Sequence, residues 1–206
     1  MAPEGKSSLQ VAIVMIRTYH DQRHPLEGIA AVEPSAAAVF RAVPERSALL
    51  VRVRSNVGPI EFGAIGLTGT FDAPGPRSSE AGAQPLHARL ELRVDRLTSG
   101  NALYDAELHR RIDTRMFPTA VVELESAEEL DAERRFRVGG PVTFHGVTRS
   151  LSGVVQLVAE TEGHVTVTGE QVFDIRDFDV ASPTMLMLKI YPDVRVYLQV
   201  EADRVG

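Results

Sequence analysis

The sequence predicts an all-β fold in which antiparallel strands build one large sheet with a single short helix. Apolar and polar residues alternate in many short stretches; Leu90, Leu92 and Val94, for example, are separated by charged residues. Turns rich in glycine, proline and asparagine join these stretches, which favours antiparallel pairing. A parallel sheet would need a helix between successive strands, and only one stretch has a helical pattern. A sheet of nine or ten strands closes into a barrel or splits into a sandwich, and the pattern alone is compatible with both.

The strands follow one another along the chain from residue 37 onward. They are predicted at residues 37–43, 49–55, 60–71, 86–97, 120–126, 135–138, 141–145, 149–159, 164–175 and 194–202. We expect the first two to pair as a hairpin across a turn at residues 44–47. Glycine at every third position of 60–71 marks bends or bulges, because the spacing fits neither a phosphate loop nor a dinucleotide fingerprint. Residues 72–85 contain three prolines and are predicted to form an exposed loop.

One helix is predicted over residues 99–112. Its apolar residues recur every four positions, at Tyr104, Leu108 and Ile112. Ser99 or Asn101 is suited to cap its first turn. We expect this helix to pack on one end of the folded β-domain.

The composition is that of a folded globular domain. Hydrophobic residues make up 44% of the 206 residues and charged residues 24%, which is enough apolar material for one domain with a core. The formal net charge is −6, and basic residues form no cluster longer than a pair, which argues against a nucleic-acid partner. The chain has no cysteine, which excludes disulfides, thiol nucleophiles and cysteine metal sites.

Residues 1–35 are predicted to form a poorly structured extension, and residues 36–204 the folded domain. The longest apolar run of the extension, residues 11–16, is too short to cross a bilayer. It is also a poor secretory signal, because Glu4 precedes it and Arg17 follows it directly. We therefore expect a protein that does not span a membrane and lies in the cytoplasm.

Three segments in the second half of the chain form a pattern. They are Met116-Phe-Pro118, VTFHGVTRSL over residues 142–151 and FDIRDFDV over residues 173–180. On the predicted helix, Asp105 and Leu108 precede them. In this order, and in a chain rich in strands, the segments resemble those of the YceI-like family.

The resemblance covers residues 37–203 and implies a lipocalin-like, antiparallel β-barrel with one short α-helix. It also implies a carrier that holds a long apolar lipid, such as a polyisoprenoid, in the barrel lumen, with no catalysis and no cofactor. Together with an apolar strip at residues 185–188, it suggests a homodimer. The chain departs from the family pattern at Asp179, where the family has glycine, and it has no tryptophan. The sequence therefore does not identify the ligand.

A lipid-binding lumen would be lined by inward-facing strand residues and by phenylalanines. The candidate ligand-binding residues are Leu90, Leu92, Val94, Phe117, Phe136, Phe144, Val155, Val167, Phe173, Phe178, Val196 and Leu198. Such side chains suit a dry tunnel for an apolar chain. They equally suit a solid core, since an eight-stranded barrel has the size at which either occurs. The alternative is a stress-related or structural barrel that interacts with proteins and has a filled core without ligand.

The polar candidates also have structural explanations. His145 precedes Gly146 at a predicted hairpin tip, where its ring can contact a ligand or bond a nearby backbone group. Asp105 and His109 lie one helical turn apart, but two ligands without a third make a weak metal site, so no metal is expected. Enzyme motifs such as G-x-S-x-G and H-E-x-x-H are absent from the sequence. An enzyme would need an active site assembled in space from scattered groups in the barrel mouth.

Overall fold

The computed structural model describes residues 38–72, 84–161, 163–181, 184–185 and 188–206. The predicted extension 1–35 and most of the predicted loop 72–85 lie outside these residues, as do the side chains of the strip at 185–188. The strands are β1 (Val39–Ala42), β2 (Ala48–Ser55), β3 (Gly58–Ile65), β4 (Thr68–Asp72), β5 (Gln84–Arg93), β6 (Thr119–Glu129), β7 (Arg135–Phe144), β8 (Val147–Thr161), β9 (His164–Asp174), β10 (Thr184–Met185) and β11 (Leu188–Arg204). The helical elements are the helix α2 (Ala102–Arg111) and the short 3-10 turns η1 (Pro44–Arg46), η2 (Val94–Arg96) and η3 (Ile175–Phe178).

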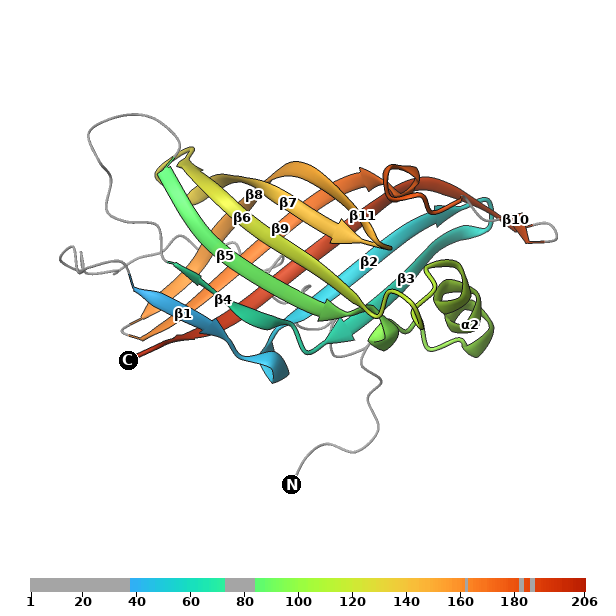
Figure 1. Cartoon of the computed structure of the whole chain (residues 1–206), viewed down its shortest axis with the longest axis horizontal. Coiled ribbons are helices and arrows are strands. Elements are labelled where there is room, and N and C mark those ends of the chain that lie inside the picture. The colour runs from blue at the N-terminus through green and yellow to red at the C-terminus, as the bar shows by residue number, and fades with distance from the viewer. Residues whose placement is uncertain (1–37, 73–83, 162, 182–183, 186–187) are drawn as a thin grey trace, which may run out of the picture.

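The strands close into an eight-stranded antiparallel barrel (Figure 1). Along the sheet the order is β1-β4-β5-β6-β7-β8-β9-β11-β2-β3, and a further pairing of β1 with β11 completes the ring. β1 and β2 both pair with β11, so together they form one interrupted strand of the barrel. β4 pairs with β1 and β3 pairs with β2, so β3 and β4 together form a second interrupted strand. The predicted all-β barrel with one short helix is confirmed.

The predicted hairpin of the first two strands is wrong. Both strands run antiparallel to β11, with Ala42 opposite Ala202 and Ala48 opposite Gln199, so the chain keeps its direction. The single turn of η1 displaces the strand without reversing it. Pro44 at the start of η1 supplies no backbone N–H and interrupts the hydrogen-bond ladder locally. In the sequence such a proline resembles that of a hairpin turn.

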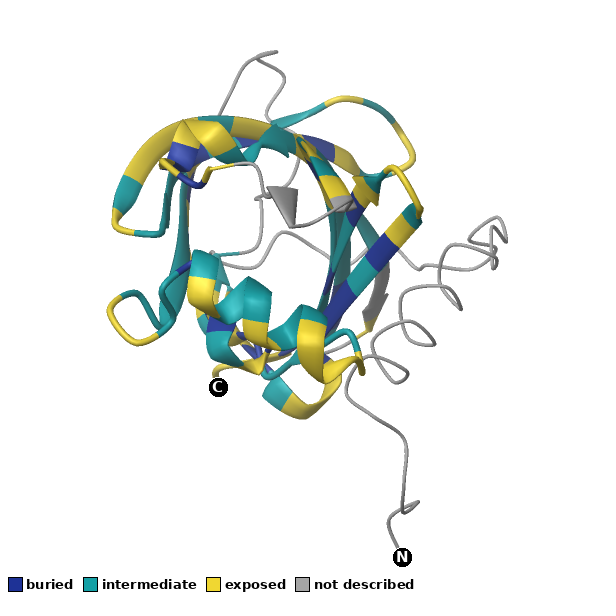
Figure 2. Cartoon of the chain, turned by 90° about the vertical axis from the view of Figure 1, so that its right-hand side faces the viewer, coloured by how far each residue is buried: buried dark blue, intermediate teal, exposed yellow. Residues whose placement is uncertain are grey.

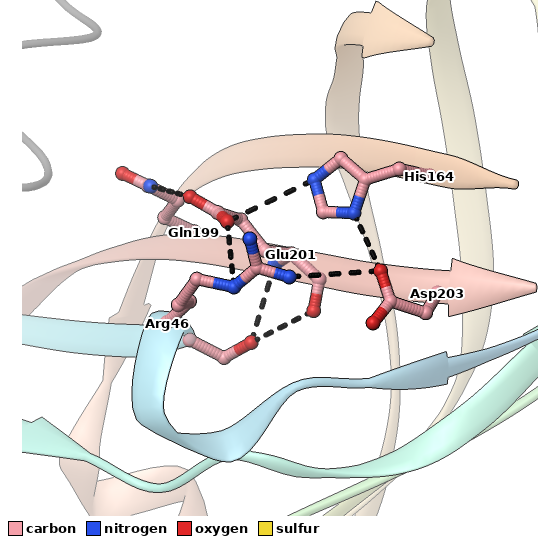
Figure 3. Close-up of polar contacts among 6 residues, drawn as sticks. Arg46, His164, Gln199, Glu201 and Asp203 are labelled. Atoms are coloured by element: carbon pink, nitrogen blue, oxygen red, sulfur yellow. Dashed lines mark hydrogen bonds and ion pairs between the residues drawn. The ribbon is translucent and has the colours of Figure 1, made fainter. Parts of the chain in front are cut away.

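A polar cluster bridges this break on the outer face of β11 (Figure 3). The Ser47 hydroxyl donates to the carbonyl oxygen of Glu201 and accepts from its N–H, both at 3.2 Å. The Arg46 guanidinium lies 3.3 Å from the Glu201 carboxylate and 3.6 Å from that of Asp203. His164 Nδ1 lies 2.7 Å from Asp203 Oδ1. The cluster thus holds β9, β11 and the start of β2 together.

We expect Ser47→Ala to lower the free energy of unfolding by about 1–2 kcal/mol, because Ser47 is fully buried and its loss leaves the Glu201 N–H without that acceptor. Urea unfolding measures the change. The matched control is Ser150→Ala, at an exposed position, which should shift stability by less than about 0.5 kcal/mol. Equal losses in the two variants would contradict this role of Ser47.

β7 is one strand, whereas the sequence predicts two strands, 135–138 and 141–145. Two adjacent glycines, Gly139 and Gly140, are typical of a turn in the sequence. In the structure they lie within β7, where its backbone approaches that of β6 closely. A Cβ on Gly140 would lie 2.1 Å from the carbonyl oxygen of Glu123 on β6. The register of β6 against β7 shifts between Val122 and Ser126, so β6 bulges at this position.

The helix α2 lies across part of one end of the barrel, called the helix end below (Figure 2). Of the two predicted caps, Ser99 and Asn101, it is Asn101 that caps the helix, because its side-chain oxygen accepts from the N–H groups of Leu103 (3.0 Å) and Tyr104 (3.3 Å). The predicted stripe of Tyr104, Leu108 and Ile112 packs on the barrel core. No helix within the described residues has the length and apolar character that crossing a bilayer requires.

The other end of the barrel, where the C-terminus lies, is called the terminal end (Figure 1). A buried cluster of Leu86, Ala127, Phe136 and Val138, with Val155 packed against it, fills the barrel between β5, β6, β7 and β8. Part of the barrel interior is therefore a solid core.

Candidate functional site

An apolar cavity of about 340 Å³ lies inside the barrel and extends to the helix end. Inward-facing aliphatic and aromatic side chains of β2, β3, β5, β6, β7, β8, β9 and β11 form its wall, and α2, η2 and η3 add residues at the helix end. The volume lies within the range of about 300–1,000 Å³ that is typical of small-molecule sites. The barrel is therefore hollow on the helix side and filled on the other.

Most of the predicted site residues line this cavity. They are Leu90, Leu92, Val94, Phe144, Val155, Phe173, Phe178, Val196 and Leu198. Phe117, Phe136, Val167 and His145 do not line it.

Two of the residues outside the cavity wall, Phe136 and Val167, show that alternation in the sequence does not give a residue's depth along the barrel. Phe136 is 6% exposed and belongs to the cluster that fills the barrel. Val167 pairs with Val200, which is 1% exposed and packed in the core, so Val167 is on the inner face but beyond the cavity. The period of two gives the face of the sheet and carries no information on depth along the barrel.

The three segments on which the family resemblance rests, residues 116–118, 142–151 and 173–180, meet at the helix end. The ring of Phe117 packs edge-on against His145, with centroids 5.1 Å apart. His145 Nδ1 lies 3.0 Å from the carbonyl oxygen of Phe178, so the ring donates this hydrogen bond. Gly146 has a φ of 75°, and a Cβ there would lie 2.5 Å from the Phe117 ring. His145 thus bonds a backbone group, one of the two roles that the sequence left open, and the cluster fixes the β7–β8 turn to η3.

Asp105 anchors α2 to the preceding segment. Its carboxylate accepts from the Thr98 hydroxyl, the Ser99 hydroxyl and the Ser99 N–H, each at 2.6 Å. His109 lies on the same helix, with Nε2 2.9 Å from the carbonyl oxygen of Leu97. Asp105 and His109 are thus both engaged in holding the helix. The described residues contain no group of three His, Asp or Glu side chains that could hold a metal ion.

The pKa of Asp105 lies below its ordinary value. Burial of the carboxyl raises this pKa, but the hydrogen bonds from Ser99 and Thr98 together outweigh burial and lower it. The folded state thus binds this proton more weakly than the unfolded chain does. The stabilisation is complete above the ordinary pKa of about 4 and is lost as the pH falls through the lower folded-state pKa.

We expect Asp105→Asn to lower the free energy of unfolding by about 2 kcal/mol at neutral pH, because an amide replaces a charged acceptor of three hydrogen bonds. Thermal melts at neutral pH and below pH of about 3 test this, since the difference from wild type should shrink in acid as the wild-type carboxyl becomes protonated. A difference in melting temperature between Asp105→Asn and wild type that stays constant over this pH range would contradict this role of the Asp105 carboxylate.

The sequence pattern did not identify the part of the cavity wall that comes from β2, β3 and α2. Val51, Val53, Ile60, Phe62 and Leu108 line the cavity. The alternation of Val51 and Val53 with arginines, and the helical stripe, were signals for an inward face. They did not show that β2 and β3 border the hollow part of the barrel, because that depends on the strand order.

The wall carries few charges, and two of them lie on α2. Glu107 and Arg111 line the cavity at the helix end, and Glu107 also pairs with Arg110 at 2.9 Å. The hydrogen bond from Arg110 lowers the pKa of Glu107, burial opposes it, and the bond from Arg111 lowers it further. Polar groups therefore sit beside α2, while the interior offers apolar surface, an arrangement that suits binding of a molecule with an apolar tail.

The family model described as the YceI-like domain matches residues 40–202. No curated protein matches the chain in sequence.

Solved structures share the fold at low sequence identity. BcnA of Burkholderia cenocepacia is 14% identical with a TM-score of 0.64, and the match covers 78% of this chain and 98% of BcnA. A polyisoprenoid binding domain from Saccharophagus degradans, implicated in plant cell wall breakdown, is 14% identical with a TM-score of 0.61, covering 82% and 100%. The YceI protein of Campylobacter jejuni is 14% identical with a TM-score of 0.51, covering 66% and 92%.

Proposed function

This chain belongs to the YceI-like domain family, and from that premise we propose that it binds a long apolar lipid of the polyisoprenoid type in its barrel. The observation that carries the proposal is the cavity of about 340 Å³ with an almost wholly hydrocarbon wall. The Saccharophagus degradans domain with this fold is named for polyisoprenoid binding, which supports the same class of ligand.

The wall favours an apolar chain for a physical reason. Each square ångström of apolar surface that a ligand and the wall remove from water contributes roughly 25 cal/mol, and a hydrocarbon chain buries such surface along its whole length. A polar molecule would lose its hydration without finding partners among Leu92, Val122 and Val196. Glu107 and Arg111 are placed to receive a polar end group at the helix end.

We propose a binding or carrier role, without catalysis. The cavity is the feature that distinguishes this barrel from the alternative of a filled-core interaction protein. A homodimer and a cytoplasmic location stay predictions from the sequence.

Displacement of a fluorescent dye tests the proposal. An amphiphilic dye with apolar rings, such as anilinonaphthalene sulfonate, bound in the cavity, should be displaced by geranylgeraniol in a saturable manner. Glucose, a polar molecule, should leave the dye bound. Failure of geranylgeraniol to displace the dye or to bind when titrated directly would contradict the proposed function.

A further inference from the structure

The barrel wall splits between β8 and β9. These strands pair from Thr161 opposite His164 to Val154 opposite Glu170. Beyond that point β8 still pairs with β7, and β9 still pairs with β11. Residues 147–153 of β8 and 171–174 of β9, all within the described part of the chain, have no strand pairing with each other. This unpaired stretch is called the seam.

The cavity reaches the seam. On β2, β5, β6, β7 and β11 only every second residue lines the cavity, as a closed barrel requires. On β8 the consecutive residues Leu151 to Val155 all line it, and on β9 so do Gly169 to Gln171. Ser152, Val154 and Glu170 face outward by alternation, so the cavity opens toward the outer surface here.

The edges of the seam are partly apolar. Val154 and Val172, which face outward on β8 and β9, are 41% and 45% exposed. Glu170 is paired with Arg195 on the outer face. Phe178 of η3, 2% exposed and packed on Phe144 and Phe173, covers the side toward the helix end.

Gln171 lies in the seam itself. Its amide nitrogen donates to the carbonyl oxygen of Val172 at 3.1 Å. Its amide oxygen would lie 3.1 Å from a Cβ on Gly153, so the glycine leaves room for this side chain. Because β8 and β9 form no backbone hydrogen-bond ladder in the seam, the flexible side chain of Gln171 separates the cavity from the surface.

We propose that the seam is a lateral window through which part of a long isoprenoid chain leaves the barrel, past Gln171 and along Val154 and Val172. The inference rests on the proposed function and adds an exit route for the lipid chain. The cavity is small and does not extend to Phe136, which lies in the buried cluster at the terminal end. A short chain fits inside, and a longer chain needs an exit whose rim is apolar.

A disulfide across the seam tests the window. Continuing the register of Val154 with Glu170 places Ser152 opposite Val172, both facing outward, so a bridge there closes the seam from its outer side. The chain has no cysteine of its own, so Ser152→Cys with Val172→Cys introduces a single pair. Gln156→Cys with Thr168→Cys is the matched control, because those residues already pair in the closed part of the same two strands.

Farnesol and the much longer solanesol are the probes. Oxidation of the seam pair should weaken solanesol binding by about tenfold or more and change farnesol binding by less than about twofold, and reduction should restore it. The control pair should change neither. If the seam cysteines do not join, a bimane adduct on Val172→Cys should produce the same selective loss, while the adduct on the exposed Val39→Cys should not.

Unchanged solanesol binding in the bridged or bimane-labelled seam variant, or equal loss of both alcohols, would overturn the window. In that case wild type still binds both alcohols, and the proposed function stands. Wild type that binds neither alcohol would overturn the proposed function and the window with it.

Discussion

Val196→Trp should abolish binding of a polyprenyl chain and leave the melting temperature of the barrel nearly unchanged. Val196 of β11 lines the cavity, so the larger ring enters space that is empty of protein atoms. Val200, further along the same strand and on the same face, is 1% exposed and belongs to the packed core. Val200→Trp should therefore destabilise the protein by about 3 kcal/mol or more, since overpacking forces the surrounding core apart.

The two variants form a matched pair, with the same substitution in the same strand. Thermal melts and retention of labelled geranylgeraniol on both proteins and on wild type measure the outcome. Similar destabilisation by the two substitutions would show that the barrel is filled around Val196 as well. Undiminished retention by Val196→Trp would show that the chain binds elsewhere.

Gly140→Ala should be among the most destabilising single-methyl additions in the barrel, lowering the free energy of unfolding by about 3 kcal/mol. The new Cβ would lie 2.1 Å from the Glu123 carbonyl oxygen, so the backbones of β6 and β7 must separate. At the adjacent Gly139, the nearest atom to a Cβ is the side-chain oxygen of Ser126 at 3.3 Å, which can rotate away. Gly139→Ala should therefore cost less than about 1 kcal/mol.

Chemical unfolding of the two alanine variants in parallel measures this difference. If Gly140→Ala unfolds at the same denaturant concentration as Gly139→Ala, then the close approach of the two strands is not a constraint on the fold. Intact ligand binding in Gly139→Ala would serve as the check that the rest of the barrel is undisturbed.

The sequence was sufficient for the class of fold because alternation is a local property. The inward faces of β5 and β11 were assigned from Leu90, Leu92, Val196 and Leu198, and these residues do line the cavity. The helix and its Asn101 cap also depend on neighbours in the chain.

The errors arose where contacts between distant segments decide the structure. Pro44 with its neighbours resembled a hairpin turn, but pairing of both flanking strands with β11 keeps the chain running in one direction. Phe136 and Val167 face inward, yet whether an inward residue meets a cavity or a neighbour depends on packing across the barrel. The seam could not be predicted, because β8 and β9 each continue as regular strands where their mutual pairing ends.

We propose that the hollow half of the barrel holds an apolar lipid chain. Organic extraction of natively purified wild type and of Val196→Trp, followed by mass spectrometry, tests it most directly. We expect isoprenoid hydrocarbon chains at near-stoichiometric amounts from wild type and their loss from Val196→Trp. Equal amounts of the same lipid from both proteins, or no lipid from wild type together with no uptake of added geranylgeraniol, would contradict it.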